Sequence, residues 1–333
     1  MDNPLLEVKN LAIEFRTGQR RLPAVQDLSF TIGRGSTLAV LGESGCGKSI
    51  TAKAIMGILP TPPARITEGQ ILLEGTDLLA LSPKAFRKVQ GAEIAMVFQD
   101  ALSALNPVVP VVRQIAELYR IHRGAGRKDA EAAAIDMMRA VKIPDAANRA
   151  GDYPFQFSGG MRQRIMIAMA LALEPKLLIA DEPTTALDVT VQAQILDLLA
   201  ELQQERNMSL MLITHDLGVA AQIAEEALVM YSGGLVERAP IAQLLDRPAH
   251  PYTIGLLGSI PGPQHKGGDL PTISGLPPQL ANRPSGCSFH PRCRFATELC
   301  RSEAPPLHRM SADRTTACHH WKEVKDEYPV AQA

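Results

Sequence analysis

Residues 42–49 of this chain read Gly42-Glu43-Ser44-Gly45-Cys46-Gly47-Lys48-Ser49. It fits the pattern G-x-x-x-x-G-K-[ST], in which the glycines let successive backbone N–H groups converge on a phosphate. The apolar run at residues 38–41 is typical of a buried strand, and residues 50–56 are typical of a helix whose N-terminus adds its positive end. The stretch predicts a nucleoside triphosphate site in which Lys48 reaches the β- and γ-phosphates and Ser49 gives its hydroxyl oxygen to Mg²⁺.

Length and composition place the chain among globular proteins. It has 333 residues, 46% of them hydrophobic, and a net charge of −1, which is enough for one large domain with an appendage and gives no field that would attract nucleic acid. The N-terminus lacks a basic segment followed by an apolar one, and the apolar helix expected at residues 165–173 is shorter than the ~20 residues that span a membrane. We therefore expect a cytosolic protein that meets a membrane only through partners.

Strand-like and helix-like runs alternate up to about residue 235. Buried strands are predicted at residues 94–98, 177–180 and 210–213, and a helix at 189–206. Residues 6–16 and 24–32 predict an antiparallel pair, and residues 229–231 and 235–237 a hairpin around 232–234. A mainly helical insert is expected at residues 107–157, with its clearest helix at 128–141. The fold class is α/β.

The composition changes in the last third of the chain. Thirteen of the 25 prolines and four of the five cysteines lie from Pro240 onward. Proline at this density excludes long helices and central strands. The segment needs another source of order, and its cysteines are the candidates.

Two further motifs carry chemistry. Asp181 and Glu182 close an apolar strand, where one carboxylate can hold Mg²⁺ and the other can act as general base toward water. A solvated acidic turn is the alternative for an isolated Asp-Glu pair. Ser158-Gly159-Gly160 precedes an apolar helix, with Ser158 as a natural N-cap and the glycines leaving N–H groups open to an anion. An ordinary capped helix is the alternative there.

Taken together, these motifs resemble the ATP-binding cassette (ABC) ATPases. Ser158-Gly159-Gly160 resembles the signature motif of that family, usually Leu-Ser-Gly-Gly-Gln; here Phe157 and Met161 replace the outer residues. The resemblance implies a P-loop NTPase fold: a RecA-like core, an antiparallel β subdomain, and a helical subdomain at about residues 100–160. It also implies that the signature residues Ser158, Gly159, Gly160 and Met161 contact ATP held by a second chain.

Other positions match the family one by one. Gln99 resembles the Q-loop glutamine, Ala186-Leu187-Asp188 the D-loop, and His215 the switch histidine that contacts the γ-phosphate. Phe15 lies where the family places an aromatic ring against adenine, although Phe30 is also upstream. The resemblance implies Mg²⁺ binding by Ser49, Gln99 and Asp181, and catalysis by Glu182, His215, Lys48 and Gln99. The expected ATP-binding set is Phe15, Gly42 to Ser49, Ile50, Gln99, Asp181 and His215.

The family also implies partners. Two such domains sandwich two ATP molecules, each site combining the phosphate loop of one chain with the signature motif of the other. Residues 100–107 resemble the groove in which transporter members receive a helix of a membrane subunit; a buried helix start is the alternative for Leu102 and Leu105.

The C-terminal part narrows the resemblance. His250-Pro251-Tyr252-Thr253, residues 256–261 and Ser274 to Pro278 resemble the extension of oligopeptide and dipeptide importer ATPases. The implied domains are residues 1–245, the ATPase, and 246–333, the extension. The implied function is ATP hydrolysis that powers import of dipeptides or oligopeptides from the cytoplasmic face of the inner membrane. The implied partners are a second ATPase subunit forming a heterodimer, two integral-membrane permease subunits, and an extracytoplasmic substrate-binding protein.

Rival functions stay open at this point. The cargo could be nickel, glutathione or another small solute, because cargo choice belongs to other subunits. A soluble ABC ATPase acting on nucleic acid or ribosomes would be expected to show basic surfaces or coiled-coil inserts, and the sequence shows neither. A P-loop phosphotransferase leaves the signature motif and the C-terminal part unexplained.

Cys287, Cys293, Cys300 and Cys318 are spaced C-x5-C-x6-C-x17-C. Four thiolates can enclose Zn²⁺ or an iron–sulfur cluster. Structural zinc sites usually include a pair two to four residues apart, which is missing here, and related importer ATPases carry a [4Fe–4S] cluster in this extension. The cluster is favoured over zinc and over four unrelated buried thiols. For Cys46 in the phosphate loop, an inert small residue is favoured over an oxidisable thiol.

Overall fold

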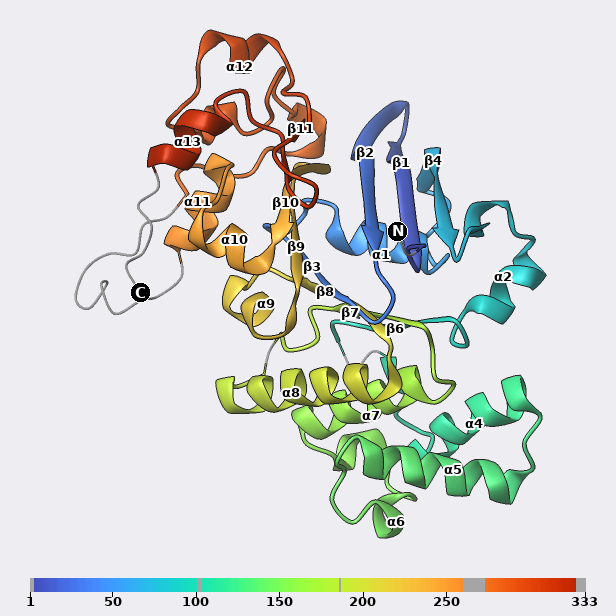
Figure 1. The fold of residues 1–333 in the computed structure, drawn as a ribbon. Coiled ribbons are helices and arrows are strands. Elements are labelled where there is room, and N and C mark those ends of the chain that lie inside the picture. The colour runs from blue at the N-terminus through green and yellow to red at the C-terminus, as the bar shows by residue number, and fades with distance from the viewer. Residues whose placement is uncertain (1–2, 101–103, 186, 260–272, 328–333) are drawn as a thin grey trace. The chain divides into compact units, whose positions relative to one another are not determined.

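A computed structural model describes residues 3–100, 104–185, 187–259 and 273–327 (Figure 1). These residues divide into two compact units that interleave along the chain. The first unit consists mainly of residues 78–213. The second consists mainly of residues 6–32, 37–77 and those from Thr214 onward.

An antiparallel sheet opens the second unit. It consists of β1 (Leu6–Thr17), β2 (Arg20–Ile32), β4 (Ala64–Leu73) and β5 (Thr76–Asp77), in the order β2-β1-β4-β5. Buried and more exposed residues alternate over most of β1, as in a sheet with one face on the core. The antiparallel pair expected near the N-terminus is confirmed.

The second unit also contains the strand that leads into the phosphate loop. β3 (Thr37–Leu41) is buried throughout and pairs in parallel with β9 (Glu226–Tyr231). β9 turns into β10 (Gly234–Pro240) at Ser232 and Gly233, whose φ angles of 48° and 82° give a hairpin turn of the kind that matches strand twist. The predicted hairpin is confirmed. α1 (Lys48–Ile55) and α9 (Leu217–Ile223) complete this part of the unit.

Three parallel strands form the sheet of the first unit. β6 (Ile94–Val97), β7 (Leu177–Asp181) and β8 (Ser209–Thr214) are buried over their whole length. β7 pairs with β6 on one side and with β8 on the other. Continuous apolar runs are what parallel strands buried on both faces require, so the sequence pattern predicted all three correctly.

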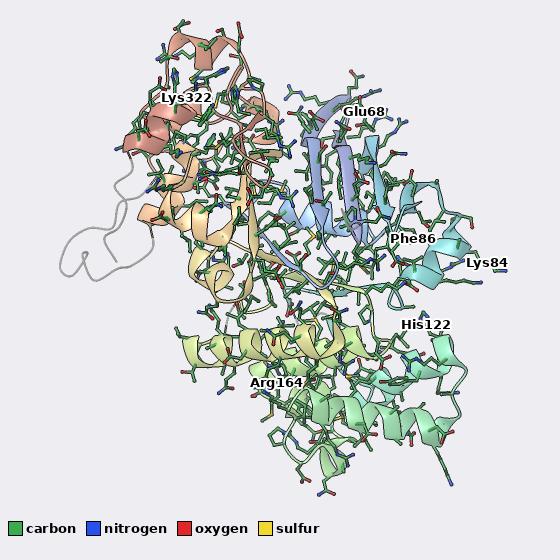
Figure 2. The ribbon with its side chains drawn as sticks, in the orientation of Figure 1. Glu68, Lys84, Phe86, His122, Arg164 and Lys322 are labelled. Atoms are coloured by element: carbon green, nitrogen blue, oxygen red, sulfur yellow. The ribbon has the colours of Figure 1, made fainter. Side chains whose placement is uncertain are left out.

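Helices make up the rest of the first unit, where α5, α7 and α8 pack together (Figure 1). The helical insert is confirmed, and α5 and α8 begin and end within one residue of their predicted bounds. Arg164 on α7 connects these helices, donating to the carbonyl of Val141 and the side chain of Gln194, both at 3.2 Å (Figure 2). The helical elements of the unit are η1 (Leu78–Ala80), α2 (Pro83–Val89), α4 (Val111–Arg123), α5 (Arg127–Ala140), α6 (Ala146–Arg149), η2 (Pro154–Gln156), α7 (Gly159–Leu171) and α8 (Val189–Arg206).

The C-terminal extension belongs to the second unit and is built from short elements. In its described part no helix exceeds the eight residues of α11, as the proline content predicts. Its elements are α10 (Ile241–Asp246), α11 (Pro251–Gly258), η4 (Leu280–Asn282), η5 (His290–Arg292), α12 (Glu298–Ser302), β11 (His308–Arg309), β12 (Thr315–Thr316) and α13 (Trp321–Glu327).

Aromatic packing and one buried ion pair hold the extension to the β9–β10 hairpin. The rings of Tyr231, Tyr252 and Phe289 lie 4.6 to 5.4 Å apart, within the range of favourable ring contacts. Glu237 on β10 is fully buried and accepts from the Arg314 guanidinium at 3.0 Å. A buried carboxylate needs such a partner, so the ion pair fixes the extension on this strand.

Within the described residues, no helix is both long enough and apolar enough to cross a membrane.

The buried His250 should make the free energy of unfolding depend on pH. Complete burial lowers the pKa of this imidazole from 6.5 to about 3. Above pH 6.5 both folded and unfolded states hold it neutral; between pH 6.5 and about 3 only the unfolded state takes up the proton. The free energy of unfolding should therefore fall by up to about 1.4 kcal/mol for each pH unit of acidification in this window because of His250.

Thermal unfolding followed from pH 7 to pH 4 checks this. His250→Gln should lower the midpoint at pH 7 yet show a shallower decline with acidification. The matched control is His122→Gln, which changes an exposed histidine at the end of α4 (Figure 2). Equal slopes for wild type and His250→Gln would contradict the assignment.

Candidate active site

The phosphate loop connects β3 to α1 in a conformation that only glycine adopts readily. Gly42, Gly45 and Gly47 have φ angles of 146°, 81° and 109°. At Gly42 an added Cβ would lie 2.3 Å from the carbonyl oxygen of Met230, so backbone fills the space a side chain would need. Gly47 directly precedes α1, which places the N-terminus of that helix at the end of the loop.

Lys48 is held inside the loop. Its Nζ donates to the carbonyl oxygens of Gly42 at 2.6 Å and Glu43 at 3.1 Å, and the residue is buried. These bonds fix the ammonium against the backbone of the loop. A bound triphosphate would offer the ammonium stronger, charge-assisted acceptors than these carbonyls.

The turn of the β9–β10 hairpin is hydrogen-bonded to the phosphate loop and to β2. The N–H of Gly233 donates to the carbonyl of Cys46 at 2.9 Å, and the N–H of Gln26 donates to the carbonyl of Gly233 at 2.9 Å. Burial raises the pKa of the Cys46 thiol, which keeps it protonated. Because only the thiolate reacts readily, a raised pKa agrees with the expectation that Cys46 is an inert small residue.

Tyr252 of the extension also contacts the loop, a contact that sequence reasoning missed. Its hydroxyl accepts from the N–H of Glu43 at 2.7 Å, and burial raises its pKa, so the hydroxyl stays protonated. The sequence motif at His250 to Thr253 identified the extension. It could not predict this contact, because Glu43 and Tyr252 are 209 positions apart and no local pattern connects them.

The first unit brings together two predicted catalytic residues. Nε2 of Gln99, just after β6, donates to Oε2 of Glu182 at 3.0 Å, and the hydroxyl of Thr185 donates to the same oxygen at 3.0 Å. These bonds hold the Glu182 carboxylate in one place at the carboxyl ends of β6 and β7. Ligands of open α/β sheets bind at this edge.

The backbone at Glu182 is strained. Its φ angle is 47°, a left-handed conformation that costs a non-glycine residue about 1 kcal/mol or more. Its N–H donates to the carbonyl of Ile213 at 2.9 Å, which anchors the turn to β8. The preceding Asp181 is 5% exposed at the end of β7. The catalytic role of Glu182 stays a prediction.

The signature segment starts α7 as predicted. Ser158 is the N-cap, with its hydroxyl accepting from the N–H of Met161 at 3.4 Å. A Cβ on Gly160 would lie 2.5 Å from Cγ1 of Val191 on α8, so this glycine permits close packing of α7 and α8. That is a structural reason for one residue of the motif besides any contact with phosphate.

Arg149 connects the two positions at which the segment departs from the family pattern. Its guanidinium lies 4.1 Å from the ring centroid of Phe157 and donates to the sulfur of Met161 at 3.2 Å. Asp152 accepts from the same guanidinium at 3.0 Å. Sequence reasoning missed this residue, because an arginine in a helical insert carries no motif of its own.

The remaining predicted site residues lie on several elements of the fold. Asp188 is the N-cap of α8 and accepts from the N–H of Val191 at 3.0 Å; its D-loop neighbour Ala186 lies outside the described residues. His215 lies exposed between β8 and α9. Phe15 on β1 is half-buried and Phe30 is buried in the core, so of these two Phe15 offers ring surface to a ligand. The roles of these residues, and of Ser49 and Ile50 at the start of α1, stay predictions.

The segment predicted to receive a membrane subunit is described only in part. Residues 101–103, and Leu102 with them, lie outside the described residues, as do Ile260 and Pro261 of the extension motif. Leu105 is buried, in agreement with the alternative of a buried helix start. Val108 is 76% exposed just before α4, so apolar surface is present close to this segment.

All four cysteines of the extension line one small cavity, together with His250, His290 and Phe289 among others. Burial raises the pKa of Cys293 to about 11 and that of Cys318 to about 12, and the neighbouring cysteines add to both shifts. However, no three His, Cys, Asp or Glu side chains in the described part of the chain are arranged to hold a metal ion. The expectation of a metal centre is therefore not supported by a ready-made single-ion site.

Two parts of the chain match known protein families. Residues 25–185 match the family model described as ABC transporter, and residues 236–300 match the one described as oligopeptide/dipeptide transporter, C-terminal region. An oligopeptide transport ATP-binding protein, OppD, of Haemophilus influenzae is 48% identical over 316 residues, covering 95% of this chain and 97% of that protein. This chain belongs to the ABC transporter ATPases.

Further relatives agree with this assignment. A Brucella melitensis protein that carries the provisional name peptide import ATP-binding protein is 47% identical to this ATPase over 332 residues, 96% of this chain and 98% of the relative. Among solved structures, a dimeric post-hydrolysis state of the cassette MJ0796 bound to ADP and Pi has a TM-score of 0.64 at 26% identity, covering 71% of this chain and 98% of that one. The predicted P-loop NTPase fold of the ABC ATPases is confirmed.

The close packing of the phosphate loop at Gly42 predicts that a side chain there weakens nucleotide binding. Gly42→Ala forces a Cβ into the Met230 carbonyl and requires a φ angle that alanine avoids, so the loop must change shape. Nucleotide affinity of the purified ATPase, measured by isothermal titration with MgATP, should fall by about tenfold or more. Gly151→Ala is the control, because an added Cβ there meets nothing within 4 Å. Wild-type affinity in Gly42→Ala would contradict this description of the loop.

Proposed function

We propose that this ATPase powers the import of dipeptides or oligopeptides. The observation that carries the proposal is the joining of an ABC ATPase region to a C-terminal region of the oligopeptide/dipeptide transporter type in one chain. The names of the Haemophilus influenzae and Brucella melitensis relatives support the same cargo class. Nickel, glutathione or another small solute would be the cargo if that C-terminal region were shared with importers of other solutes.

Each residue of the site has a separate role in ATP hydrolysis. Lys48 and the N–H groups of the loop bind the β- and γ-phosphates, and Ser49 and Asp181 are the residues that would hold Mg²⁺. Glu182 accepts a proton from the attacking water, and the hydrogen bond from Gln99 fixes the carboxylate in position for that transfer. His215 contacts the γ-phosphate. Mg²⁺ held there would supply positive charge that neutralises the phosphates.

Each site is completed by a second chain. Ser158 and the glycines at the start of α7 present a capped helix N-terminus, which suits the γ-phosphate of an ATP held by another subunit. ATP then acts as the link between two subunits, and its hydrolysis lets them separate. We expect the second subunit to be a related ATPase in a heterodimer, with Asp188 at the interface between them.

The importer also requires membrane subunits. We expect two integral-membrane permease subunits, with this chain bound at the cytoplasmic face of the inner membrane, and an extracytoplasmic substrate-binding protein that delivers the cargo. The exposed apolar side chain of Val108, beside the segment at residues 100–107, suits contact with a permease helix. Affinity purification in mild detergent tests this: permease subunits should copurify, and recovery of the ATPase alone would contradict the importer assignment.

We also propose that the four cysteines hold a [4Fe–4S] cluster with a structural role. All four line one cavity, and cysteine thiolates are the ligands such clusters take. The four cysteines include no pair two to four residues apart, as structural zinc sites usually do, which favours a wider cluster over zinc. The four thiolates would also hold four separate stretches of a proline-rich segment together.

Removing the proposed general base separates binding from chemistry. Glu182→Gln keeps the size of the side chain but cannot accept a proton at neutral pH, so kcat should fall by roughly 10²- to 10⁴-fold. MgATP should still bind, and ATP-bound dimers should accumulate in size-exclusion chromatography. Glu201→Gln, an exposed carboxylate on α8, is the control. Unchanged turnover of Glu182→Gln in the assembled complex would refute the role of Glu182.

The cluster proposal is tested by composition. The protein purified without oxygen should be brown and contain about four iron and four sulfide per chain. Cys293→Ser should lower both contents, whereas Cys46→Ser should not, because Cys46 lies in the phosphate loop. A colourless wild-type protein that contains zinc and no iron would end the proposal.

A further inference from the structure

The phosphate loop contains an acidic side chain that the extension neutralises. Glu43 is the second residue of the loop, and its carboxylate accepts two hydrogen bonds from the guanidinium of Arg292: Nη1 to Oε2 at 2.6 Å and Nη2 to Oε1 at 3.0 Å. This is the parallel, two-bond arrangement in which arginine binds carboxylates most strongly. The Arg292 side chain is 5% exposed and that of Glu43 is 26% exposed, so water screens the pair only partly.

Arg292 is held in place by the extension itself. Nε donates to the carbonyl of Ser274 at 3.0 Å, and Nη1 lies 3.4 Å from the hydroxyl of Tyr231. The guanidinium also lies 5.9 Å from the ring centroid of Phe289. A guanidinium fixed on so many sides loses little conformational entropy when it binds Glu43, which strengthens the pair.

The same turn carries one of the four cysteines. Arg292 ends η5 and Cys293 follows it, with the N–H of each bonded within the turn to the carbonyls of Phe289 and His290. The folding of the cysteine-rich part of the extension therefore decides where Arg292 lies.

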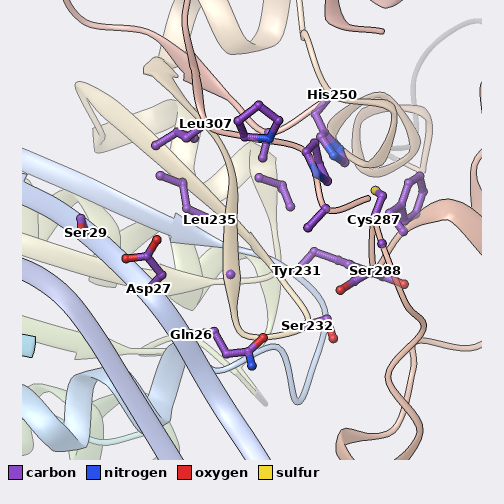
Figure 3. A pocket seen from close by; sticks show the side chains of 18 of the residues that line it. Gln26, Asp27, Ser29, Tyr231, Ser232, Leu235, His250, Cys287, Ser288 and Leu307 are labelled. Carbon is purple, nitrogen blue, oxygen red and sulfur yellow. The ribbon is translucent and has the colours of Figure 1, made fainter. Parts of the chain in front are cut away.

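Two further contacts join the extension to the loop and its support. Tyr252 holds the backbone of Glu43, as described above. Arg283 donates to the hydroxyl of Ser232 at 3.0 Å and to the carbonyl of Pro23 at 3.2 Å, and so holds the hairpin turn on which the loop rests. Figure 3 shows that turn at Ser232, with Tyr231 and Cys287 lining the same cavity of the second unit.

We infer that the extension sets the nucleotide affinity of the phosphate loop through Arg292, which neutralises Glu43 and holds it away from the phosphates. An unpaired carboxylate in the loop would repel a triphosphate of like charge over a distance at which partial burial leaves the repulsion strong. Arg292 is thus a positioning residue that acts through Glu43. The inference rests on the proposed ATP site and adds the extension as a condition for its full affinity.

The experiment measures MgATP affinity of the full chain by isothermal titration, together with KM and kcat in the assembled complex. Arg292→Met should weaken binding by about tenfold or more, because a charge-assisted pair is broken and the carboxylate stays. KM should rise more than kcat falls. Adding Glu43→Gln to Arg292→Met should restore most of the affinity, since the repelling charge is then gone. Arg301→Met is the control, because its partner Glu298 is largely exposed.

The double variant separates positioning from folding. A merely structural loss in Arg292→Met would not be rescued by Glu43→Gln, and absence of rescue would overturn the inference. Should Arg292→Met fail to fold, Arg292→Lys carries the test, because it keeps the charge and loses the two-bond geometry: an intermediate loss of affinity is expected, and wild-type affinity would overturn the inference. Lys48→Ala tests the ATP site separately from the role of Arg292. If the wild-type protein bound MgATP no more tightly than Lys48→Ala, the ATP site itself would be refuted.

Discussion

The structure depends on the backbone of the phosphate loop, which packs closely against neighbouring backbone at Gly42 and Gly47. The carbonyl of Met230 takes the space next to Gly42, and the carbonyl of Ala24 lies 3.2 Å from where a Cβ of Gly47 would be. The loop therefore has carbonyl oxygens of β9 and β2 as its immediate neighbours. The glycines of the loop have two effects. They allow backbone N–H groups to converge on an anion, and they leave room for the β9–β10 hairpin to pack against the loop.

This constraint explains why the C-terminal extension belongs with the loop in the second unit. Tyr252 and Arg292 contact the loop itself, and Arg283 contacts the hairpin that packs against it. Proline excludes long helices from this segment, so its order comes from buried aromatic rings and from the Glu237–Arg314 pair. The cluster proposed above would fix the same turn that presents Arg292 and would then affect nucleotide binding without any part in the chemistry.

Much of the fold could be predicted from local pattern, because the elements that form it carry their own signals. Continuous apolar runs identified β6, β7 and β8, and the cap at Ser158 placed the start of α7. The catalytic candidates followed from residue type at strand ends, and the structure added that Gln99 and Glu182 bond directly. The contacts between the extension and the loop, which the sequence could not predict, join distant residues. Glu43 lies 249 positions from Arg292 and 209 positions from Tyr252. Spacing along the chain carries no information about such pairs, since only the tertiary fold brings them together.

ATP hydrolysis by this chain drives peptide import. The most direct measurement is the ATP turnover of the complete complex reconstituted in proteoliposomes, with the substrate-binding protein supplied and its cargo varied. We predict that dipeptides or oligopeptides raise turnover and accumulate inside the vesicles, while nickel and glutathione do neither. Turnover that responds to nickel or glutathione and ignores peptides would contradict the account.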